Sequence, residues 1–464
     1  MAVSERRAER LTLVAMSLGF AVVQLDISVV NVAIKAIGDA LGGGVSALQW
    51  VVNAYTIGFA AFILTAGALA DRIGAKGVFV AGFALFTTAS VVCGLAPDLG
   101  VLIAARAVQG IGAAVLVPSS LTLLNHAYTD AAARAHAVGL WLAGASLALS
   151  GGPLVGGVLI ATLGWRAIFF INVPVALIGI WLSRRFAGET PQARDRGVDV
   201  AGQAFAVLTL TALVAATIEG GTQGFGSLPV LVGYALAALA GVIFVALEAR
   251  GARPMLPLAL FRARAFSAPA AIGILINTAF YGLIFVFSLL FQRAQHLTAL
   301  QTGLALAPIM VAITAANVAA GRVNRLVGPR RTVAAGVVAF AACCAGLLGV
   351  GARTGYAAMV VQLTLLGAAA GSIVPVITSE MLGSVDRSRS GVAAGTLNTL
   401  RQTGSAIGVA LFGSLLAGSG ITVGVHISLG ITIGLSAVIL TLTPLMAARP
   451  GAGAEPAPPS RASG

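Results

Sequence analysis

Long apolar runs separated by short polar breaks make up most of the chain between residues 11 and 446. A run of about 18 or more apolar residues can cross a hydrocarbon core about 30 Å thick. The pattern therefore predicts an all-α membrane protein with fourteen spanning helices. The predicted spans cover residues 11–34, 48–70, 77–96, 100–124, 136–162, 167–183, 200–218, 229–248, 266–292, 300–321, 332–350, 355–381, 391–418 and 421–446.

The first run follows Arg6, Arg7 and Arg10, as the apolar core of a secretory signal peptide would. It is longer than the core of about 7–15 residues found in such peptides, and no small-residue cleavage site stands out. We therefore predict that this first helix is retained.

Composition narrows the possible functions. Of the 464 residues, 58% are apolar and only 9% are charged, against about 25% charged residues in a soluble domain. So few charged side chains exclude a soluble enzyme, a secreted scaffold and a disordered protein. The sequence contains no phosphate-binding loop, metal-ligand cluster or nucleophile–base arrangement, so it predicts no enzymatic activity, no cofactor and no metal.

The net charge of +13 does not indicate a nucleic-acid partner, because the basic residues stand in small groups between apolar runs. Of the 28 Lys and Arg residues, 22 fall on one side of the predicted membrane. The others are Lys35, Arg166, Arg293 and Arg353 on the opposite side, and Arg106 and Arg401 within spans. Cytoplasmic loops collect Lys and Arg, so both termini are predicted to be cytoplasmic.

Two parts of the chain resemble each other. Gly110 and Pro118 match Gly367 and Pro375, both at a spacing of 257 residues, and the loop 71–76 resembles the loop 324–330. Parallel repeats of this kind build secondary transporters, whose substrate path lies between the two halves near the membrane midplane. The spacing is too long for six helices, so we predict two six-helix bundles with two inserted spanning helices between them.

Polar breaks set the predicted domain boundaries. The N-terminal bundle covers 1–187, the two inserted helices with their flanking loops 188–265, and the C-terminal bundle 266–448. The tail 449–464 is rich in Pro, Ala and Gly, so we expect it to be a disordered cytoplasmic segment.

Two charges lie deep within predicted spans, Asp26 in the first and Arg106 in the fourth. A charge at mid-membrane is costly, so Asp26 must face a wet cavity, pair with another charge or take up a proton. We interpret Asp26 as a proton-coupling residue and Arg106 as its partner, because an approaching guanidinium expels a carboxyl proton. A static salt bridge that holds the bundle together is the alternative.

The loop between the second and third spans contains Gly67, Asp71, Arg72, Gly74 and Lys76. Its glycines permit a tight turn, and Asp71 can cap a helix or oppose cations of the other half. We interpret the loop as a cytoplasmic gate that latches the halves together. The alternative is an ordinary solvated loop.

The fifth span carries Gly152, Pro153, Gly156 and Gly157. A GxxxG spacing lets two helix backbones touch, and a proline softens or kinks the helix. We interpret this segment as a hinge-like interface, with simple packing as the alternative.

Several polar residues within the spans are candidates for lining a substrate cavity, although each could instead join helices. They are Gln24, Asn31, Asn53, Tyr55, Gln109, Asn277, Asn398, Arg401 and Gln402. Whether Glu219 or Glu380 takes part in coupling stays open.

Taken together, these motifs resemble the major facilitator superfamily, and more narrowly its drug:proton antiporter family with fourteen spans. The chain also resembles antibiotic-efflux proteins of actinomycete producers, including methylenomycin-resistance-type exporters. The resemblance rests on residues 25–33, 49–55, 67–76, 106–112, 152–157, 164–174, 254–262 and 398–404.

The resemblance implies the major facilitator fold and proton-coupled export of small amphipathic drugs by alternating access. Asp26 would then be a proton site, Arg106 an aid to proton transfer, Asp71 part of the gate, and Gly152-Pro153 the antiporter signature. It further implies a monomer in a bacterial plasma membrane, in contact with lipid. Export of a single endogenous metabolite, or a membrane sensor without transport, are the alternatives.

Overall fold

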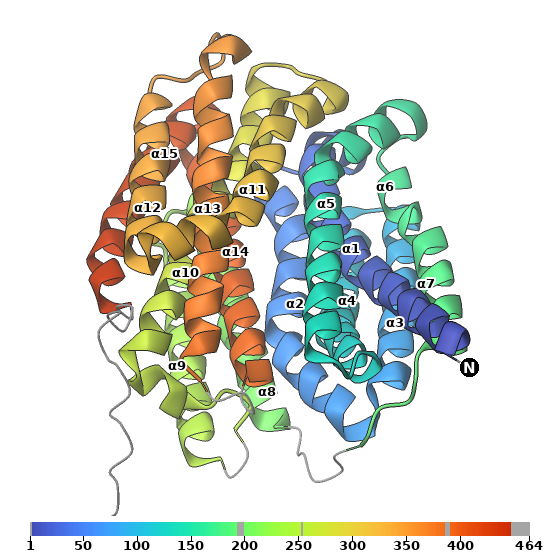
Figure 1. Ribbon diagram of the computed structural model, residues 1–464. Coiled ribbons are helices and arrows are strands. Elements are labelled where there is room, and N and C mark those ends of the chain that lie inside the picture. The colour runs from blue at the N-terminus through green and yellow to red at the C-terminus, as the bar shows by residue number, and fades with distance from the viewer. Residues whose placement is uncertain (1, 193–198, 252–253, 386–389, 447–464) are drawn as a thin grey trace, which may run out of the picture.

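The structure is a computed structural model that describes residues 2–192, 199–251, 254–385 and 390–446. Within these ranges the chain is helical and forms no strand (Figure 1). The predicted tail 449–464 lies outside the described residues.

The N-terminal half contains seven described helices that form six spans. They are α1 (Ala2–Leu41), α2 (Val45–Ile73), α3 (Ala75–Leu95), α4 (Leu99–Ala127), α5 (Ala131–Leu163), α6 (Ala167–Phe170) and α7 (Asn172–Phe186). Short α6 and α7 follow each other in one span, over Ala167–Phe186. Individual residues explain where helices end and begin. Gly74 takes a φ of 101° between α2 and α3, which a glycine adopts readily. The side chains of Asp98 and Asp130 accept backbone N–H bonds at the starts of α4 and α5.

The rest of the chain contains the two inserted helices and the second half. The long helices are α8 (Val200–Gln223), α9 (Leu228–Arg250), α10 (Arg264–Leu289), α11 (Ala299–Val327), α12 (Pro329–Gly346), α13 (Val360–Gly383), α14 (Ser390–Ser419) and α15 (Ile421–Leu442). The short ones are η1 (Leu258–Arg262), η2 (Leu290–Ala294), η3 (Tyr356–Ala358) and η5 (Thr443–Leu445).

Twelve helical segments among the described residues are long and apolar enough to cross a membrane. The two further long helices, α12 and α14, are more polar. α12 has Arg330 and Arg331 in its first turn, and α14 carries Arg401 and Gln402. All fourteen predicted spans therefore fall on helices, and the all-α fold with two inserted helices is confirmed.

Corresponding helices pack together in the two halves, as expected for the predicted repeat. α1 packs on α5 and α2 on α4 in the first half, and α10 packs on α14 and α11 on α13 in the second. Gly110 meets the backbone of Tyr55 on α2, and its repeat partner Gly367 meets the backbone of Ile309 on α11. A side chain at either glycine would overlap the neighbouring carbonyl oxygen.

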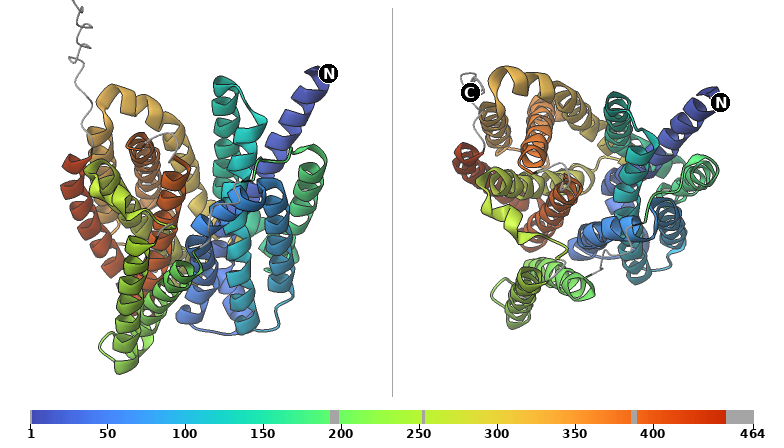
Figure 2. Two further views of the ribbon diagram at one scale, coloured as in Figure 1. Left: turned by 90° about the horizontal axis from the view of Figure 1, so that it is seen from below. Right: turned by 60° about the horizontal axis from the view of Figure 1, so that its bottom comes forward.

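The two inserted helices form a pair outside the bundles. α8 packs on α9 and also contacts α2 of the first half and α14 of the second. Figure 2 shows this green pair beside both bundles rather than between them. The Gln203 side chain on α8 donates a 3.1 Å hydrogen bond to the Ala61 carbonyl on α2.

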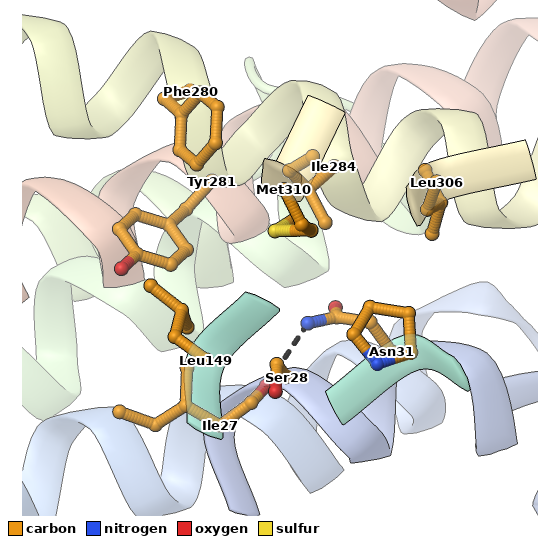
Figure 3. A pocket seen from close by; sticks show the side chains of 10 residues that line it. Ile27, Ser28, Asn31, Leu149, Phe280, Tyr281, Ile284, Leu306 and Met310 are labelled. Carbon is orange, nitrogen blue, oxygen red and sulfur yellow. Dashed lines mark hydrogen bonds between the residues drawn. The ribbon is translucent and has the colours of Figure 1, made fainter. Parts of the chain in front are cut away.

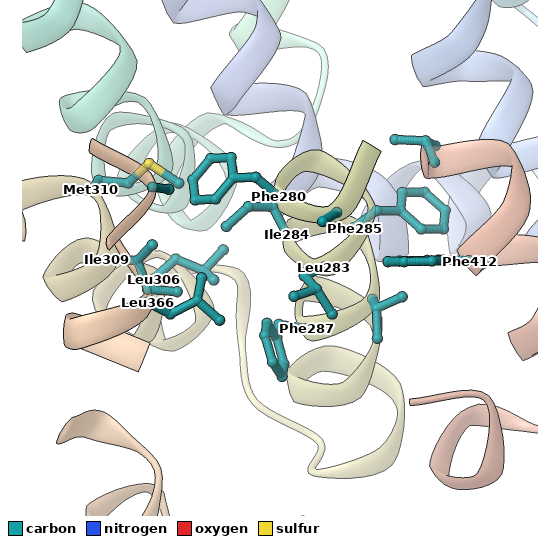
Figure 4. Packing of buried hydrophobic residues seen from close by; sticks show 14 of the residues in the cluster. Phe280, Leu283, Ile284, Phe285, Phe287, Leu306, Ile309, Met310, Leu366 and Phe412 are labelled. Atoms are coloured by element: carbon teal, nitrogen blue, oxygen red, sulfur yellow. The ribbon is translucent and has the colours of Figure 1, made fainter. Parts of the chain in front are cut away.

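The halves pack together toward the end of the molecule that is uppermost in Figure 1, where α1 meets α2. There, residues 29–37 of α1 join the apolar core of the second half, whose packing Figure 4 shows. Gln49 on α2 donates hydrogen bonds of 2.9 and 2.6 Å to the Val409 and Ala410 carbonyls on α14.

At the opposite, lower end, the first half has its own apolar cluster, which includes Phe79, Phe83 and Phe86 and takes in no residue from the second half. A separate cluster around Phe266 and Met381 lies in the second half. The apolar core thus joins the halves at the upper end and divides between them at the lower end.

Candidate functional site

A buried ion pair lies inside the first half. Arg106 on α4 donates a hydrogen bond through Nη1 to the Asp26 carboxylate on α1, and the two side chains are 1% and 0% exposed. The Arg106 Nε atom donates to the Val51 carbonyl at 3.1 Å. The structure therefore brings together the two residues that the sequence singled out as intramembrane charges.

Two amides and a hydroxyl surround the Asp26 carboxylate. Gln109 and Asn172 each donate to its Oδ1 atom, at 2.9 and 3.1 Å. Both amides also donate to Ser90, and the Gln109 carbonyl accepts from Arg106 at 2.7 Å. Such a network stabilises a carboxylate away from water, because one charged donor and two amide donors bond to its oxygen atoms.

Aromatic rings enclose the Arg106 guanidinium. Its central carbon lies 4.3 Å from the Tyr55 ring centre and 5.9 Å from that of Phe169. A cation over an aromatic face is attracted by the ring, more strongly where water is excluded. The positive charge of Arg106 is therefore stabilised by a carboxylate, two carbonyl groups and two aromatic rings of its own half.

A pocket lies between the halves, next to this network. Figure 3 shows Ile27, Ser28 and Asn31 of α1 facing side chains of α10 and α11 across it. The complete lining is Ile27, Ser28, Asn31, Leu149, Pro153, Phe280, Tyr281, Ile284, Leu306 and Met310. Because Ile27 follows Asp26 directly in α1, a shift of this helix moves the ion pair and the pocket wall together.

The predicted cavity residues divide into groups. Asn31 lines the pocket, and its amide donates to the Ile27 carbonyl at 3.0 Å. Tyr55 and Gln109 do not: they are buried around the ion pair, because their faces of α2 and α4 turn into the bundle. Asn277 is buried and donates to the Gly273 carbonyl of its own helix.

Four further candidates have side chains without a hydrogen bond to any described residue. Asn53 is fully buried on α2 with both amide atoms unpaired. Gln24 on α1 and Asn398 and Gln402 on α14 are partly exposed. Arg401 stands beside the last two and is also partly exposed.

The predicted hinge residues lie where three helices cross. Side chains at Gly152 or Gly156 would overlap Ser28 or Val29 of α1, so these glycines permit the close crossing of α5 and α1. Gly157 instead meets the start of α11, whose Gly303 meets the Pro153 carbonyl. The segment therefore contacts both its own half and the other one.

The predicted gate loop contacts the first half and the start of the inserted segment. Gly74 caps both flanking helices by backbone geometry, and Asp71 lies in the last turn of α2, so it does not cap α3. Lys76 lies 3.4 Å from Glu189, in the segment after α7. Arg72 is exposed and Gly67 packs near Pro118. A latch to the second half stays a prediction.

Sequence reasoning missed three residues of the site: Ser90, Asn172 and Tyr281. Asn172 stands between Ile171 and Val173 at the break between α6 and α7, inside the predicted span 167–183, and no role was predicted for it. Its position as an amide within an apolar run was a usable signal. Tyr281 gave none, because an aromatic residue in an apolar run is ordinary core.

Comparison with known proteins identifies the family of the chain. The family model described as Major Facilitator Superfamily matches residues 16–409, and again 270–462. The chain belongs to the Major Facilitator Superfamily. Members of this superfamily are transporters, and the protein is a transport protein rather than an enzyme.

Relatives in the superfamily are named for drug resistance. The chain is 35% identical to the methylenomycin A resistance protein of Streptomyces coelicolor over 87% of this chain and 84% of the relative. It is also 35% identical to the multidrug resistance protein Stp of Mycobacterium tuberculosis, over 89% and 76%. The tetracenomycin C resistance and export protein of Streptomyces glaucescens is 29% identical, over 88% and 76%.

A solved structure supports the fold alone. The human organic anion transporter MFSD10 (TETRAN) superposes with a TM-score of 0.65 at 17% identity, covering 95% of this chain and 99% of that one.

The family model and the relatives together confirm the predicted superfamily membership and the predicted resemblance to drug-efflux proteins.

Proposed function

We propose that the protein is a proton-coupled antiporter that exports small amphipathic, antibiotic-like molecules across a bacterial plasma membrane by alternating access. Relatives that match most of the chain are named for resistance to, or export of, such compounds. The pocket between the halves has a mostly apolar wall with a few polar groups, as sites for amphipathic molecules do, but its volume of about 10 Å³ has room for about one water, so it must open to admit a substrate.

Alternating access needs two bodies that rock about a central site. We propose residues 1–187 and 266–448 as these bodies, with 188–265 as an inserted segment that contacts both. Because Lys and Arg are in excess on the lower-end loops, we propose that this end faces the cytoplasm and that both termini are cytoplasmic. Packing of the halves at the upper end then corresponds to a state closed toward the outside.

The buried Asp26–Arg106 pair is the observation that carries the coupling proposal. Protonation of Asp26 would remove the partner of a buried arginine, and breaking a buried ion pair in this way costs about 3–5 kcal/mol. A proton moving through about 150 mV releases about 3.5 kcal/mol. The two energies are similar, so proton uptake can drive a rearrangement of α1, which also forms part of the pocket wall.

Two glycine-containing segments would allow the halves to move. Gly152, Pro153, Gly156 and Gly157 would form the hinge, since they contact α1 of their own half and α11 of the other. The loop from Gly67 to Lys76 would serve as the cytoplasmic gate. The protein would act as a monomer surrounded by lipid.

The test is Asp26→Asn in proteoliposomes, with Asp39→Asn as its matched control. Asp39 is an exposed carboxylate on the same helix, paired only with Lys35. We expect Asp26→Asn to abolish substrate accumulation driven by a pH gradient while substrate–substrate exchange continues, and Asp39→Asn to behave like the wild type. Normal gradient-driven accumulation by Asp26→Asn would refute the coupling assignment.

A further inference from the structure

The second half contains a membrane-embedded arginine whose charge is not neutralised by any group that the structure describes. Arg401 on α14 makes no hydrogen bond and no ion pair with any residue that the structure describes, and its Nε atom is buried without an acceptor. Acidic residues are also scarce in this half: between residues 266 and 446 the sequence contains only Glu380 and Asp386.

The position of Arg401 excludes an ordinary membrane-surface role. Arg401 is eleven residues into α14, so its Cα lies about 16 Å from the start of the helix, farther than an arginine side chain reaches. α14 packs on α2, α8, α10 and α15, and the Arg401 side chain lies near Gly273 of α10. The guanidinium is therefore held among helices rather than among lipid headgroups.

Arg401 lies against a helix that forms part of the pocket between the halves. Its side chain is near Gly273 of α10, and α10 also carries Phe280, Tyr281 and Ile284 of the pocket wall. The pocket wall contains no carboxylate, and Asn398 and Gln402, which flank Arg401, have side chains free of hydrogen bonds to described residues. Several unpaired donors thus lie on α14, which packs on a helix of the pocket wall.

A cation held among membrane helices without a counterion is costly even where it is partly exposed, so its presence there points to an anion that arrives with function. The planar guanidinium fits a carboxylate through two parallel hydrogen bonds. We propose that Arg401 recognises the anionic group of the substrate, whose class is therefore amphipathic organic anions. This inference rests on the proposed export function and adds the charge of what is exported.

In this arrangement the substrate carboxylate pairs with Arg401, and the apolar body lies against Tyr281 and its neighbours once the pocket, which has a volume of about 10 Å³ in this structure, has opened. The two membrane-embedded arginines then have different counterions. Arg106 has a permanent one in Asp26, whereas Arg401 has one only while substrate is bound. A membrane potential that is negative inside also favours the exit of an anion.

The experiment compares two probes of the same shape, 1-naphthaleneacetate and the neutral 1-naphthaleneacetamide, by calorimetric titration of the full-length protein in lipid nanodiscs. We expect the wild type to bind the acid at least about tenfold more tightly than the amide. Arg401→Gln should remove this preference by weakening acid binding alone. Arg322→Gln, which removes an exposed arginine of the same half, should keep it.

Equal binding of acid and amide by the wild type, or equal loss of both in Arg401→Gln, would overturn the inference. If Arg401→Gln does not fold, Arg401→Lys keeps the charge without the planar fork, and we expect it to retain part of the preference. Transport separates the two proposals. If proteoliposomes move the amide but not the acid, export is intact and anion recognition is refuted. If they move neither probe, nor a cationic naphthylmethylamine, the result counts against export itself.

Discussion

The two halves of the protein share one packing plan but treat their membrane-embedded arginines differently. In the first half, Arg106 is buried against Asp26, Gln109 and two aromatic rings. In the second half, Arg401 has no ionic or hydrogen-bonded partner among the described residues. Two copies of one scaffold can thus differ in their charges: the arginine is paired in one copy and has no described partner in the other.

The difference is chemical rather than architectural. Gly110 and Gly367 permit the same helix contact in both halves, and Gly152 and Gly156 of α5 have counterparts in Gly404 and Gly408 of α14, which meet the backbone of α10. The comparison therefore separates residues that build the bundles from residues that give each bundle its role. Three sets of substitutions probe it, from the largest expected effect to the smallest.

The largest effect is expected for Arg106→Leu, which leaves the Asp26 carboxylate buried without its partner. Breaking a buried pair in this way lowers the free energy of unfolding by about 3–5 kcal/mol. Thermal unfolding midpoints of the variant and the wild type measure the loss.

Arg401→Leu is the matched control for that prediction. It removes a charge that has no partner among the described residues, so stability should stay unchanged or rise. A loss for Arg401→Leu as large as that for Arg106→Leu would show that the contrast between the halves is wrong.

An intermediate effect is expected for Gly110→Ala and Gly367→Ala. In both variants the added methyl group overlaps a backbone carbonyl oxygen, of Tyr55 or Ile309, and the helices must separate. Overpacking of this kind typically lowers stability by about 1–3 kcal/mol. Thermal midpoints should fall by similar amounts in the two variants. Gly151→Ala, where the methyl group meets open space, should not lower the midpoint; a loss in only one half would contradict equivalent packing.

The smallest effect is expected for Lys76→Gln in the predicted gate loop. Its ion pair with Glu189 spans 3.4 Å, and the Glu189 side chain is 77% exposed. Exposed pairs contribute about 0–1 kcal/mol, and salt screens them. The unfolding midpoint should therefore move little, and less still at high salt. A large loss of stability would mean that Lys76 has a structural role beyond this pair.

The sequence predicted the helices well because a membrane leaves few alternatives to long apolar helices. It also singled out Asp26 and Arg106, since charges within apolar runs are conspicuous. The direction of a polar side chain was harder to predict. Gln109 faces the ion pair and Asn31 faces the pocket, and this depends on how α4 and α1 cross their neighbours.

The significance of Arg401 could not be predicted from its own segment. An arginine within a span suggests a functional group, but only the fold shows which carboxylates can reach it. The same holds for Asn172, whose role depends on the break between α6 and α7 that brings its amide to Asp26.

The most direct test of the account follows protons and substrate together in proteoliposomes with an imposed pH gradient. Proton-coupled export predicts that added substrate dissipates the gradient in wild-type vesicles, and that Asp26→Asn vesicles hold it while still exchanging substrate. Substrate movement that leaves the gradient untouched in wild-type vesicles would contradict the account.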